Sequence, residues 1–214
     1  MKRKAKAPAK KRAYHHGDLK DQLVAAAEAI ILERGVDGFT LREAARRAGV
    51  SPAAPAHHFR DAKGLLSEVA LRAFQDFGDA LVAADARGTD PASRLHEQGL
   101  AYVTFALSHP ARFQLMFRHA MYDIDYPGLA DTGGRAFAVL ERAVRAAMAL
   151  PEGKPMTSDA FGFLLATWSI VHGFAHLALG GDLDSAAQGL GGPKAILDRF
   201  LPLMLQHLPV PVRK

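Results

Sequence analysis

The stretch Thr40–Phe59, TLREAARRAGVSPAAPAHHF, predicts two short helices joined by a tight turn. Thr40 and Glu43, three residues apart, form a capping-box pattern that starts an eight-residue helix. We expect this helix to end at Gly49, because glycine readily takes the left-handed conformation that follows a helix. Ser51 is a second N-cap candidate, and the proline after it suits the first turn of a helix over residues 52 to about 59. Two helices joined in this way form a helix-turn-helix.

Helical periodicity continues on both sides of this motif. Before it, apolar residues recur at helical spacing from Leu19 to Ile31, between the cap candidate Asp18 and the stop candidate Gly35. After it, we expect helices at about 62–85, 91–108, 110–120, 134–149, 158–180 and 193–207, separated by proline and glycine. No stretch alternates apolar and polar residues as a strand does. The predicted fold class is all-α, with an N-terminal three-helix helix-turn-helix domain followed by a larger helical domain.

The positive charge of the chain is concentrated at its N-terminus. Residues 1–63 contain 14 Lys and Arg against seven Asp and Glu, whereas residues 64–214 contain 13 against 15. The excess lies in residues 1–12, which hold seven basic residues and no acidic one. Such a segment attracts polyanions, either nucleic acid or an anionic membrane surface, although it can also serve only as a solubility tail. We divide the chain into a basic arm at 1–13, a helix-turn-helix domain at 14–62 and a larger domain at 63–214.

Composition and motifs argue against several classes of protein. The chain has no cysteine, so disulfides and cysteine-ligated metals are ruled out, as suits the cytoplasm. Neither a signal peptide nor a run of about 18 apolar residues is present, and we expect a cytoplasmic protein with no membrane partner. A phosphate-binding glycine loop and a Gly-x-Ser-x-Gly elbow are also missing. We therefore expect neither an enzyme nor a bound cofactor.

The second helix of the motif is narrow because it carries Ala53, Ala54 and Ala56. Small side chains let the backbone approach the DNA major groove, into which the second helix of this motif fits. They can contact thymine methyl groups but cannot form bidentate hydrogen bonds with base edges. We therefore expect only modest reading of base sequence by this helix.

Several motifs together resemble the DNA-binding domain of the TetR family of one-component transcriptional repressors. They are YHHGDL, TLREAA and AGVSPAA, all within residues 14–66. Farther on, the Trp, His and Gly of WSIVHGF at residues 168–174 resemble the Trp-His-Gly motif of one branch of that family. The resemblance implies a ligand-responsive repressor that binds a palindromic operator as a homodimer and is released by a small molecule. Residues 63–214 would then be the effector-binding and dimerisation domain.

The resemblance also implies which residues meet double-stranded DNA. Thr40 and Arg42 would contact phosphate, in agreement with the free N–H groups that a helix N-terminus offers to phosphates. The full set expected at DNA is Arg12, Tyr14, Thr40, Arg42, Ser51, Pro52, Ala53, Ala54, His57, His58 and Lys63. Two phosphate contacts of the family are replaced, since its usual tyrosine and lysine are Ala56 and Ala62 here. Either the basic arm supplies the missing contacts or the chain binds DNA weakly.

Aromatic, methionine and histidine residues at helical spacing indicate an effector pocket in the larger domain. They are Tyr102, Phe105, His109, Phe113, Met116, Phe117, Trp168, His172 and His176. The alternative is that the same stripe is core, because such side chains mostly fill volume. His172 and His176 have the i, i+4 spacing of a metal pair, but we expect no metal because the glutamate of a metalloprotease helix is missing.

The last two predicted helices are the most apolar, and the first of them is apolar nearly all round. Such a helix must be covered, either by its own domain or by a second copy of the chain. The resemblance implies a dimer interface there, for which we expect Phe161, Leu165, Phe200, Leu201, Met204 and Leu205. The alternative is that these helices only close the core of the monomer.

Two further functions remain open from the sequence. One is a helical protein that binds nucleic acid or an anionic surface without specificity through its arm. The other is a metal-dependent enzyme that uses the two histidines at 172 and 176.

Overall fold

The computed structural model describes residues 16–151, 153–190 and 195–206, and these residues form helices and loops without a strand. The N-terminal helices are α1 (His16–Arg34), α2 (Leu41–Arg47) and α3 (Ala56–Phe59), with a 3-10 turn η1 (Val36–Gly38) after the first. The others are α4 (Ala62–Asp85), α5 (Pro91–Ser108), α6 (Pro110–Met116), η2 (His119–Met121), α7 (Leu129–Ala147), α8 (Ser158–Gly180), α9 (Asp184–Leu190), the π-helical η3 (Ile196–Phe200) and α11 (Leu201–Gln206). The all-α prediction is confirmed.

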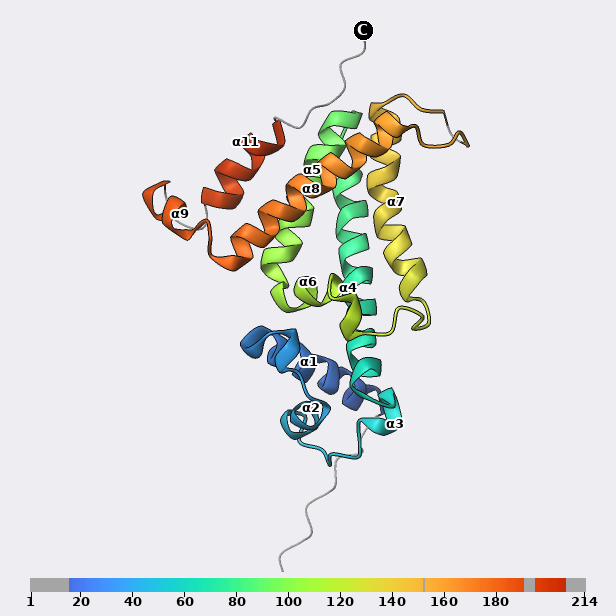
Figure 1. Cartoon of the computed structure of the whole chain (residues 1–214), viewed down its shortest axis with the longest axis vertical. Coiled ribbons are helices and arrows are strands. Elements are labelled where there is room, and N and C mark those ends of the chain that lie inside the picture. The colour runs from blue at the N-terminus through green and yellow to red at the C-terminus, as the bar shows by residue number, and fades with distance from the viewer. Residues whose placement is uncertain (1–15, 152, 191–194, 207–214) are drawn as a thin grey trace, which may run out of the picture.

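The long helix α4 connects the two ends of the molecule. In Figure 1, α1, α2 and α3 gather at one end, and α4 runs from them into a larger group in which α5 and α7 pack against it. The domain boundary predicted between residues 62 and 63 falls in the first turn of α4. The two halves of α4 thus belong to two different hydrophobic cores.

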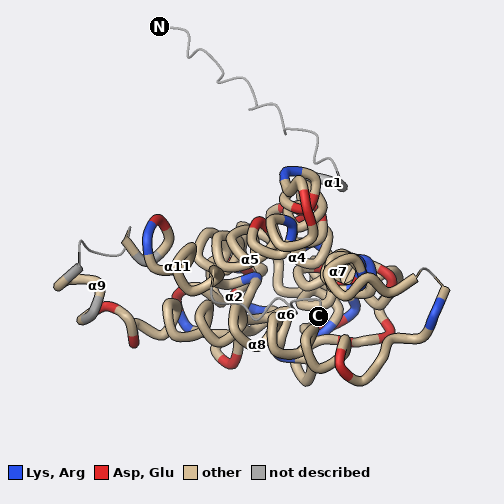
Figure 2. Tube along the Cα trace, turned by 90° about the horizontal axis from the view of Figure 1, so that it is seen from above, with Lys and Arg blue, Asp and Glu red and all other residues tan. Residues whose placement is uncertain are grey.

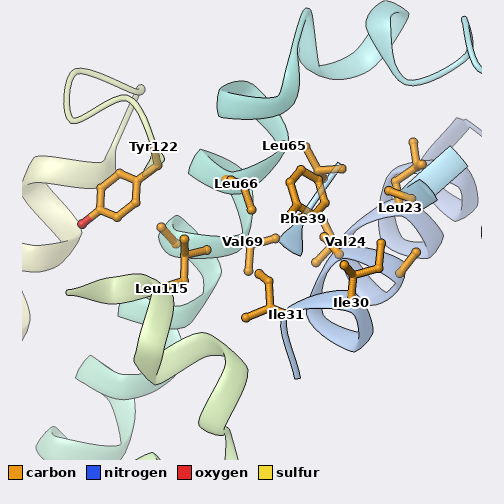
Figure 3. Close-up of a cluster of buried hydrophobic side chains, with 14 of the residues drawn as sticks. Leu23, Val24, Ile30, Ile31, Phe39, Leu65, Leu66, Val69, Leu115 and Tyr122 are labelled. Atoms are coloured by element: carbon orange, nitrogen blue, oxygen red, sulfur yellow. The ribbon is translucent and has the colours of Figure 1, made fainter. Parts of the chain in front are cut away.

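The first hydrophobic core lies between α1, the N-terminal half of α4 and α6 (Figure 3). Leu23, Ile30 and Leu65 are completely buried in it. Leu115 of α6 is completely buried in the same cluster, and Tyr122 joins it from the loop after η2. Burial of one such leucine contributes about 1.5 to 3 kcal/mol. The N-terminal helices therefore share their core with α6.

Two further cores build the larger group of helices. One gathers Phe77 from α4, Tyr102 from α5, Phe113 from α6 and Leu205 from α11. The other joins α5, α7 and α8 around Leu164, with the rest of that cluster on the same three helices. Helices α4, α5, α7 and α8 each pack against at least two others of this group.

The helix predicted over residues 52–59 is α-helical only from Ala56 to Phe59, which corrects the prediction. Residues 52–55 form consecutive turns instead, and the Ala54 N–H donates to the carbonyl oxygen of Ser51 at 3.0 Å. Pro55 explains the difference, because it has no N–H to donate to the Ser51 carbonyl four residues back. The predicted cap thus acts through its carbonyl oxygen.

Helices α6 and α7 also differ from their predicted limits, since α6 ends before residue 120 and α7 begins before residue 134. The Tyr122 hydroxyl donates to the Met116 carbonyl at 2.8 Å and satisfies the end of α6. Gly128, with φ 82°, turns the chain into α7, and the Thr132 hydroxyl donates to the Gly128 carbonyl at 2.6 Å. These are contacts that periodicity does not reveal.

The chain ends bring the remaining corrections. Helix α1 already includes His16, before the predicted cap Asp18. The sequence did not predict α9, and the helix predicted at 193–207 is π-helical over 196–200 and α-helical over 201–206. Its first two residues, and the basic arm at 1–13, lie outside the described residues.

Candidate functional site

The turn after α2 follows the pattern that the sequence indicates. Thr40 Oγ1 accepts a hydrogen bond from the Glu43 N–H at 3.3 Å and caps the helix. At the other end Gly49 has φ 69°, and across it the Val50 N–H donates to the Ala45 carbonyl at 3.0 Å. This bond is typical of a Schellman motif, which ends a helix and redirects the chain within two residues.

A second tight turn, between α3 and α4, sets the direction of α3. Arg60 has φ 64° and ψ −57°, and across it the Asp61 N–H donates to the Phe59 carbonyl at 2.7 Å, which is a γ-turn. Asp61 then caps α4, since its Oδ1 accepts from the Gly64 N–H at 2.9 Å. Residue 64 must be glycine, because a Cβ there would lie 1.9 Å from the Phe59 carbonyl oxygen. We call residues 51–59, held between these two turns, the recognition segment.

The recognition segment presents small side chains to solvent. Pro55 and Phe59 face inward and are buried. The exposed members are Ser51, Pro52, Ala53, Ala56 and His57, and Ala54 and His58 are half-buried. The residues that sequence analysis placed on or beside the segment are thus on one accessible surface, which is what entry into a DNA groove requires.

A groove of about 430 Å³ joins the start of α2 to the recognition segment. It is lined by Arg34, Thr40, Arg42, Glu43, Arg46, Val50 and Pro52. Three of these residues were predicted at DNA, but the two arginines at 34 and 46 were missed. The signal that points to them is a basic last turn on both α1 and α2.

Glu43 neutralises part of the positive charge of this groove. Its carboxylate accepts from Arg46 Nε at 2.7 Å and from Arg47 Nε at 3.0 Å. These hydrogen bonds lower the pKa of Glu43 to about 2, so it is charged at any physiological pH. Arg47 also forms an ion pair with Glu33, in which Nη2 lies 2.6 Å from Oε2. Among the described residues, Arg42 is exposed and forms no ion pair, which leaves its charge available to phosphate.

Of the residues predicted at DNA beyond the groove and the recognition segment, the structure describes only Lys63. Lys63 is exposed in the first turn of α4, directly after the recognition segment and its γ-turn. Arg12 and Tyr14 lie outside the described residues. Elsewhere on the described chain, Lys and Arg are interspersed with Asp and Glu (Figure 2), so the positive groove is a local feature.

A cavity of about 270 Å³ lies in the larger domain between α4, α5, α7 and α8. Most of its wall is apolar, and a few polar side chains interrupt it. The lining residues are Phe74, Phe77, Leu81, Leu95, Gln98, Gly99, Tyr102, Phe117, His119, Gly133, Ala136, Phe137, Leu140, Thr167, Trp168 and Val171. A small apolar cavity with few polar groups is typical of a ligand site.

Only Tyr102, Phe117 and Trp168 of the nine predicted pocket residues line this cavity. Phe113 and Met116 are completely buried in the core behind it. For these two, the alternative that the stripe is core describes the structure, because a helix buries core and cavity wall on the same face.

The other predicted pocket residues also lie outside the lining. Phe105 is buried, and exposed His109 stacks on it with ring centroids 4.8 Å apart. His172 is half-buried behind Tyr102, and His176 is exposed. The rings of these last two lie 4.5 Å apart, but no group of three or more metal-ligating side chains occurs within the part of the chain described.

Three polar groups beside the cavity form a chain of hydrogen bonds. Trp168 Nε1 donates to the Tyr102 hydroxyl at 3.3 Å, and that hydroxyl lies 2.7 Å from His172 Nδ1. Burial raises the pKa of Tyr102, and burial together with His176 lowers the pKa of His172. The lowered pKa favours a neutral imidazole, and in the tautomer with its hydrogen on Nε2 the ring accepts from the Tyr102 hydroxyl at Nδ1.

Gln98 is the lining residue whose polar side chain is not fully satisfied. It is 4% exposed, and its Nε2 donates to Asp85 Oδ1 at 2.7 Å. Its Oε1 is buried and has no hydrogen-bond partner within the described residues. Sequence analysis missed Gln98, because a single glutamine on a helix gives no signal of burial.

Helix α6 connects the cavity to the N-terminal helices. Phe117 lines the cavity, and the next residue, Arg118, donates to Asp37 of η1 at 2.6 Å. One turn earlier, Arg112 donates to Glu28 of α1 at 2.7 Å and also bonds Asp76 of α4. Ion pairs thus join α6 to α1, and the residue that follows Phe117 to η1.

The outer face of α8 is apolar and uncovered in the single chain. Phe161, Leu165 and Leu177 are 49%, 40% and 47% exposed, and glycines 162 and 173 lie on the same side. By length and composition α8 is long and apolar enough to cross a membrane, and 28% of its most apolar stretch is buried within the described structure.

The remaining predicted interface residues lie on α11 and at its start. Leu201 is completely buried, and Leu205 is 3% exposed, because both fill the core of their own chain. Phe200 and Met204 are half-buried, whereas Leu203, which was not predicted, is 47% exposed. Of the six predicted interface residues, the two on α8 are thus the exposed ones.

Family models match both parts of the chain. Residues 23–69 match the model described as bacterial regulatory proteins, tetR family, and residues 95–201 match a tetracyclin repressor-like C-terminal domain. No curated protein matches the chain by sequence.

Solved structures share the whole fold. A protein of unknown function from Rhodococcus sp. RHA1 has 32% identity and a TM-score of 0.70, over 92% of this chain and 98% of that one. A tetR-family regulatory protein from Rhodococcus RHA1 has 21% identity and a TM-score of 0.66, over 89% and 96% of the two chains. AibR, solved with isovaleryl coenzyme A and operator DNA, has 16% identity and a TM-score of 0.62, over 86% and 97%.

Proposed function

Since the chain belongs to the TetR family of bacterial regulatory proteins, we propose that it is a transcriptional repressor released from DNA by a small molecule. The observation that carries this proposal is the exposed recognition segment, held between two tight turns beside an arginine-lined groove. In this role the segment enters the major groove, while Thr40 and Arg42 contact phosphate. Catalysis is not part of the proposal.

The link through α6 supports release by a ligand. A molecule that fills the cavity presses on Phe117, and the ion pair of Arg118 with Asp37 passes the displacement to η1. A second ion pair, between Arg112 and Glu28, ties the same helix to α1. The ligand thus favours an arrangement of the N-terminal helices that fits DNA less well, which is the differential affinity that release requires.

The uncovered face of α8 supports a homodimer. Phe161, Leu165 and Leu177 would lose water on pairing with a second copy, and the glycines at 162 and 173 let two helices approach closely. A two-fold dimer presents two recognition segments, so its operator is palindromic, with half-sites about one helical turn or a multiple of it apart.

The basic arm, residues 1–12, is proposed to replace the phosphate contacts that Ala56 and Ala62 cannot make. Each neutralised phosphate contributes a slope of about 0.9 to the dependence of log affinity on log salt. Deletion of the arm should therefore reduce the magnitude of that slope by about 0.9 for each phosphate that the arm contacts. An unchanged slope would assign the weak-binding alternative to this chain.

The finer assignments complete the proposal. We assign the chain to the branch with the Trp-His-Gly motif, because Trp168 and His172 are joined through the Tyr102 hydroxyl and thus have a defined structural role. We place it in the cytoplasm, where its DNA is. The ligand of AibR is not carried over, because the cavity here is small and none of its described lining residues is Lys or Arg.

Selection from a random DNA library tests the proposal. The bound pool should converge on a two-fold symmetric motif. Arg42→Ala should lower affinity for all sequences alike and reduce the salt slope by about one, as loss of a phosphate contact does. Arg142→Ala removes an exposed arginine of α7 and serves as the matched control, which should change neither quantity. A pool without any shared motif would reject the repressor function.

A further inference from the structure

In the cavity wall, the hydrogen-bond donors of Trp168 and Thr167 have protein partners, whereas the acceptor Gln98 Oε1 has none within the described residues. We propose that its ligand is an uncharged, mainly apolar small molecule with one hydrogen-bond donor, and that Gln98 Oε1 accepts from this donor. The inference rests on the proposed function in taking the cavity as the effector site.

The donors of the cavity wall are already occupied by protein partners. Trp168 Nε1 donates to Tyr102, the Tyr102 hydroxyl is hydrogen-bonded to His172 Nδ1, and the Thr167 hydroxyl donates to the Phe163 carbonyl at 2.9 Å. A ligand that offers only acceptors would have to break one of these bonds. Of the other donors on the described wall, Gln98 Nε2 is bonded to Asp85, and His119 is exposed to solvent.

Gln98 offers a hydrogen-bond acceptor to a ligand. Its Nε2 faces two acceptors, Asp85 Oδ1 at 2.7 Å and the Val139 carbonyl oxygen at 3.5 Å. The amide cannot be turned over, because Oε1 would then face a carboxylate and a carbonyl. Oε1 thus remains an acceptor without a protein donor, in a residue that forms part of the cavity wall. A buried acceptor left unpaired costs about 1 to 3 kcal/mol, so a ligand donor that reaches it gains affinity.

The remaining wall selects against charge. None of its described residues is Lys, Arg, Asp or Glu, and aromatic and aliphatic side chains such as Phe74, Phe77 and Leu140 dominate it. An anion placed there would lose its hydration without a cation to compensate it. A volume of about 270 Å³ limits the ligand to the size of one or two rings.

Three probes of similar shape test this inference, namely 4-tert-butylphenol, its methyl ether and 4-tert-butylbenzoate. The phenol is a neutral donor, the ether has no donor and the benzoate is an anion. Trp168 is the only tryptophan and lines the cavity, so the change in its fluorescence reports binding to the full chain. Each probe is titrated into the wild type and into Gln98→Met, which keeps length but removes the acceptor. Gln75→Met is the matched control, because it makes the same substitution at an exposed glutamine of α4 that does not line the cavity.

We expect the wild type to bind the phenol about tenfold more tightly than the ether, in proportion to one hydrogen bond to a buried acceptor. Gln98→Met should abolish this preference, and Gln75→Met should keep it. The benzoate should bind most weakly of the three. If Gln98→Met fails to fold, the wild-type preference alone decides.

Two results would overturn the inference. One is a wild type that binds the ether or the benzoate as tightly as the phenol, or a preference that persists in Gln98→Met. The other is an unchanged Trp168 fluorescence with every probe. Failure of the proposed function is recognised separately, since the phenol would then bind with the expected preference but leave DNA affinity unchanged.

Discussion

Replacement of Gly64 by alanine should disrupt the junction that orients the recognition segment. An ideal Cβ at this position lies 1.9 Å from the Phe59 carbonyl oxygen, whereas real Cβ atoms keep at least 3.0 Å from such neighbours. The backbone of the γ-turn must therefore move by more than an ångström, at a cost of about 3 kcal/mol or more. For a chain of this size that corresponds to a fall in Tm of roughly 6 to 12 °C.

The control for this experiment is the same substitution in an open place. Gly134 lies inside α7 with nothing within 4 Å of an added Cβ, so Gly134→Ala should raise stability by about 0.5 to 1 kcal/mol through its better helix propensity. Thermal unfolding followed by circular dichroism measures both changes. A Gly64→Ala variant as stable as the wild type, or as Gly134→Ala, would refute the steric argument.

Three further substitutions test the ion pairs of Glu68, dimer formation through α8 and the coupling between the cavity and DNA binding. Glu68 accepts from Lys20, Arg72 and Tyr126, and although burial raises its pKa, these hydrogen bonds outweigh burial and lower it below the ordinary value of 4.5. The ionised Glu68 carboxylate therefore stabilises the fold fully above pH 4.5, and this stabilisation is lost as the pH falls through the lower pKa of the folded state. Glu68→Gln should thus make the free energy of unfolding depend less steeply on pH at acid pH. An unchanged dependence would contradict this. Leu165→Glu should yield a monomer in light scattering because it would place a carboxylate in the apolar face proposed to pair with a second copy, whereas Leu32→Glu, at a still more exposed leucine of α1, should not change the mass. Arg118→Ala should leave ligand affinity at the cavity within about twofold but weaken ligand-induced DNA release, and undiminished release would show that the ion pair to η1 is not needed.

The sequence predicted best those features that depend on residues close together in the chain. The cap at Thr40 and the stop at Gly49 each need contacts over only a few residues, and both were found. The same reasoning overestimated α3, because the single missing N–H of Pro55 shifts the balance from helix to turns. Local signals thus fixed the motif but not the length of its second helix.

The cavity could not be predicted in the same way, because four helices far apart in sequence enclose it. Phe113 and Tyr102 follow the same apolar periodicity, yet one is core and the other lines the cavity. Gln98 was missed because burial of its amide depends on Asp85 and Val139, which come from two other helices. Periodicity therefore indicates which face is buried, but not whether side chains or a ligand fill the space behind it.

The most direct test of the central claim is the specificity ratio of the full chain for DNA. Fluorescence anisotropy at physiological salt gives the affinity for DNA carrying the selected symmetric motif and for random-sequence DNA of equal length. A repressor that reads bases through the small side chains of the recognition segment should favour the motif by about a thousandfold, which is the lower end of the range for specific DNA-binding proteins. Equal affinities for the two DNAs would contradict the account and leave only attraction between the basic arm and any polyanion.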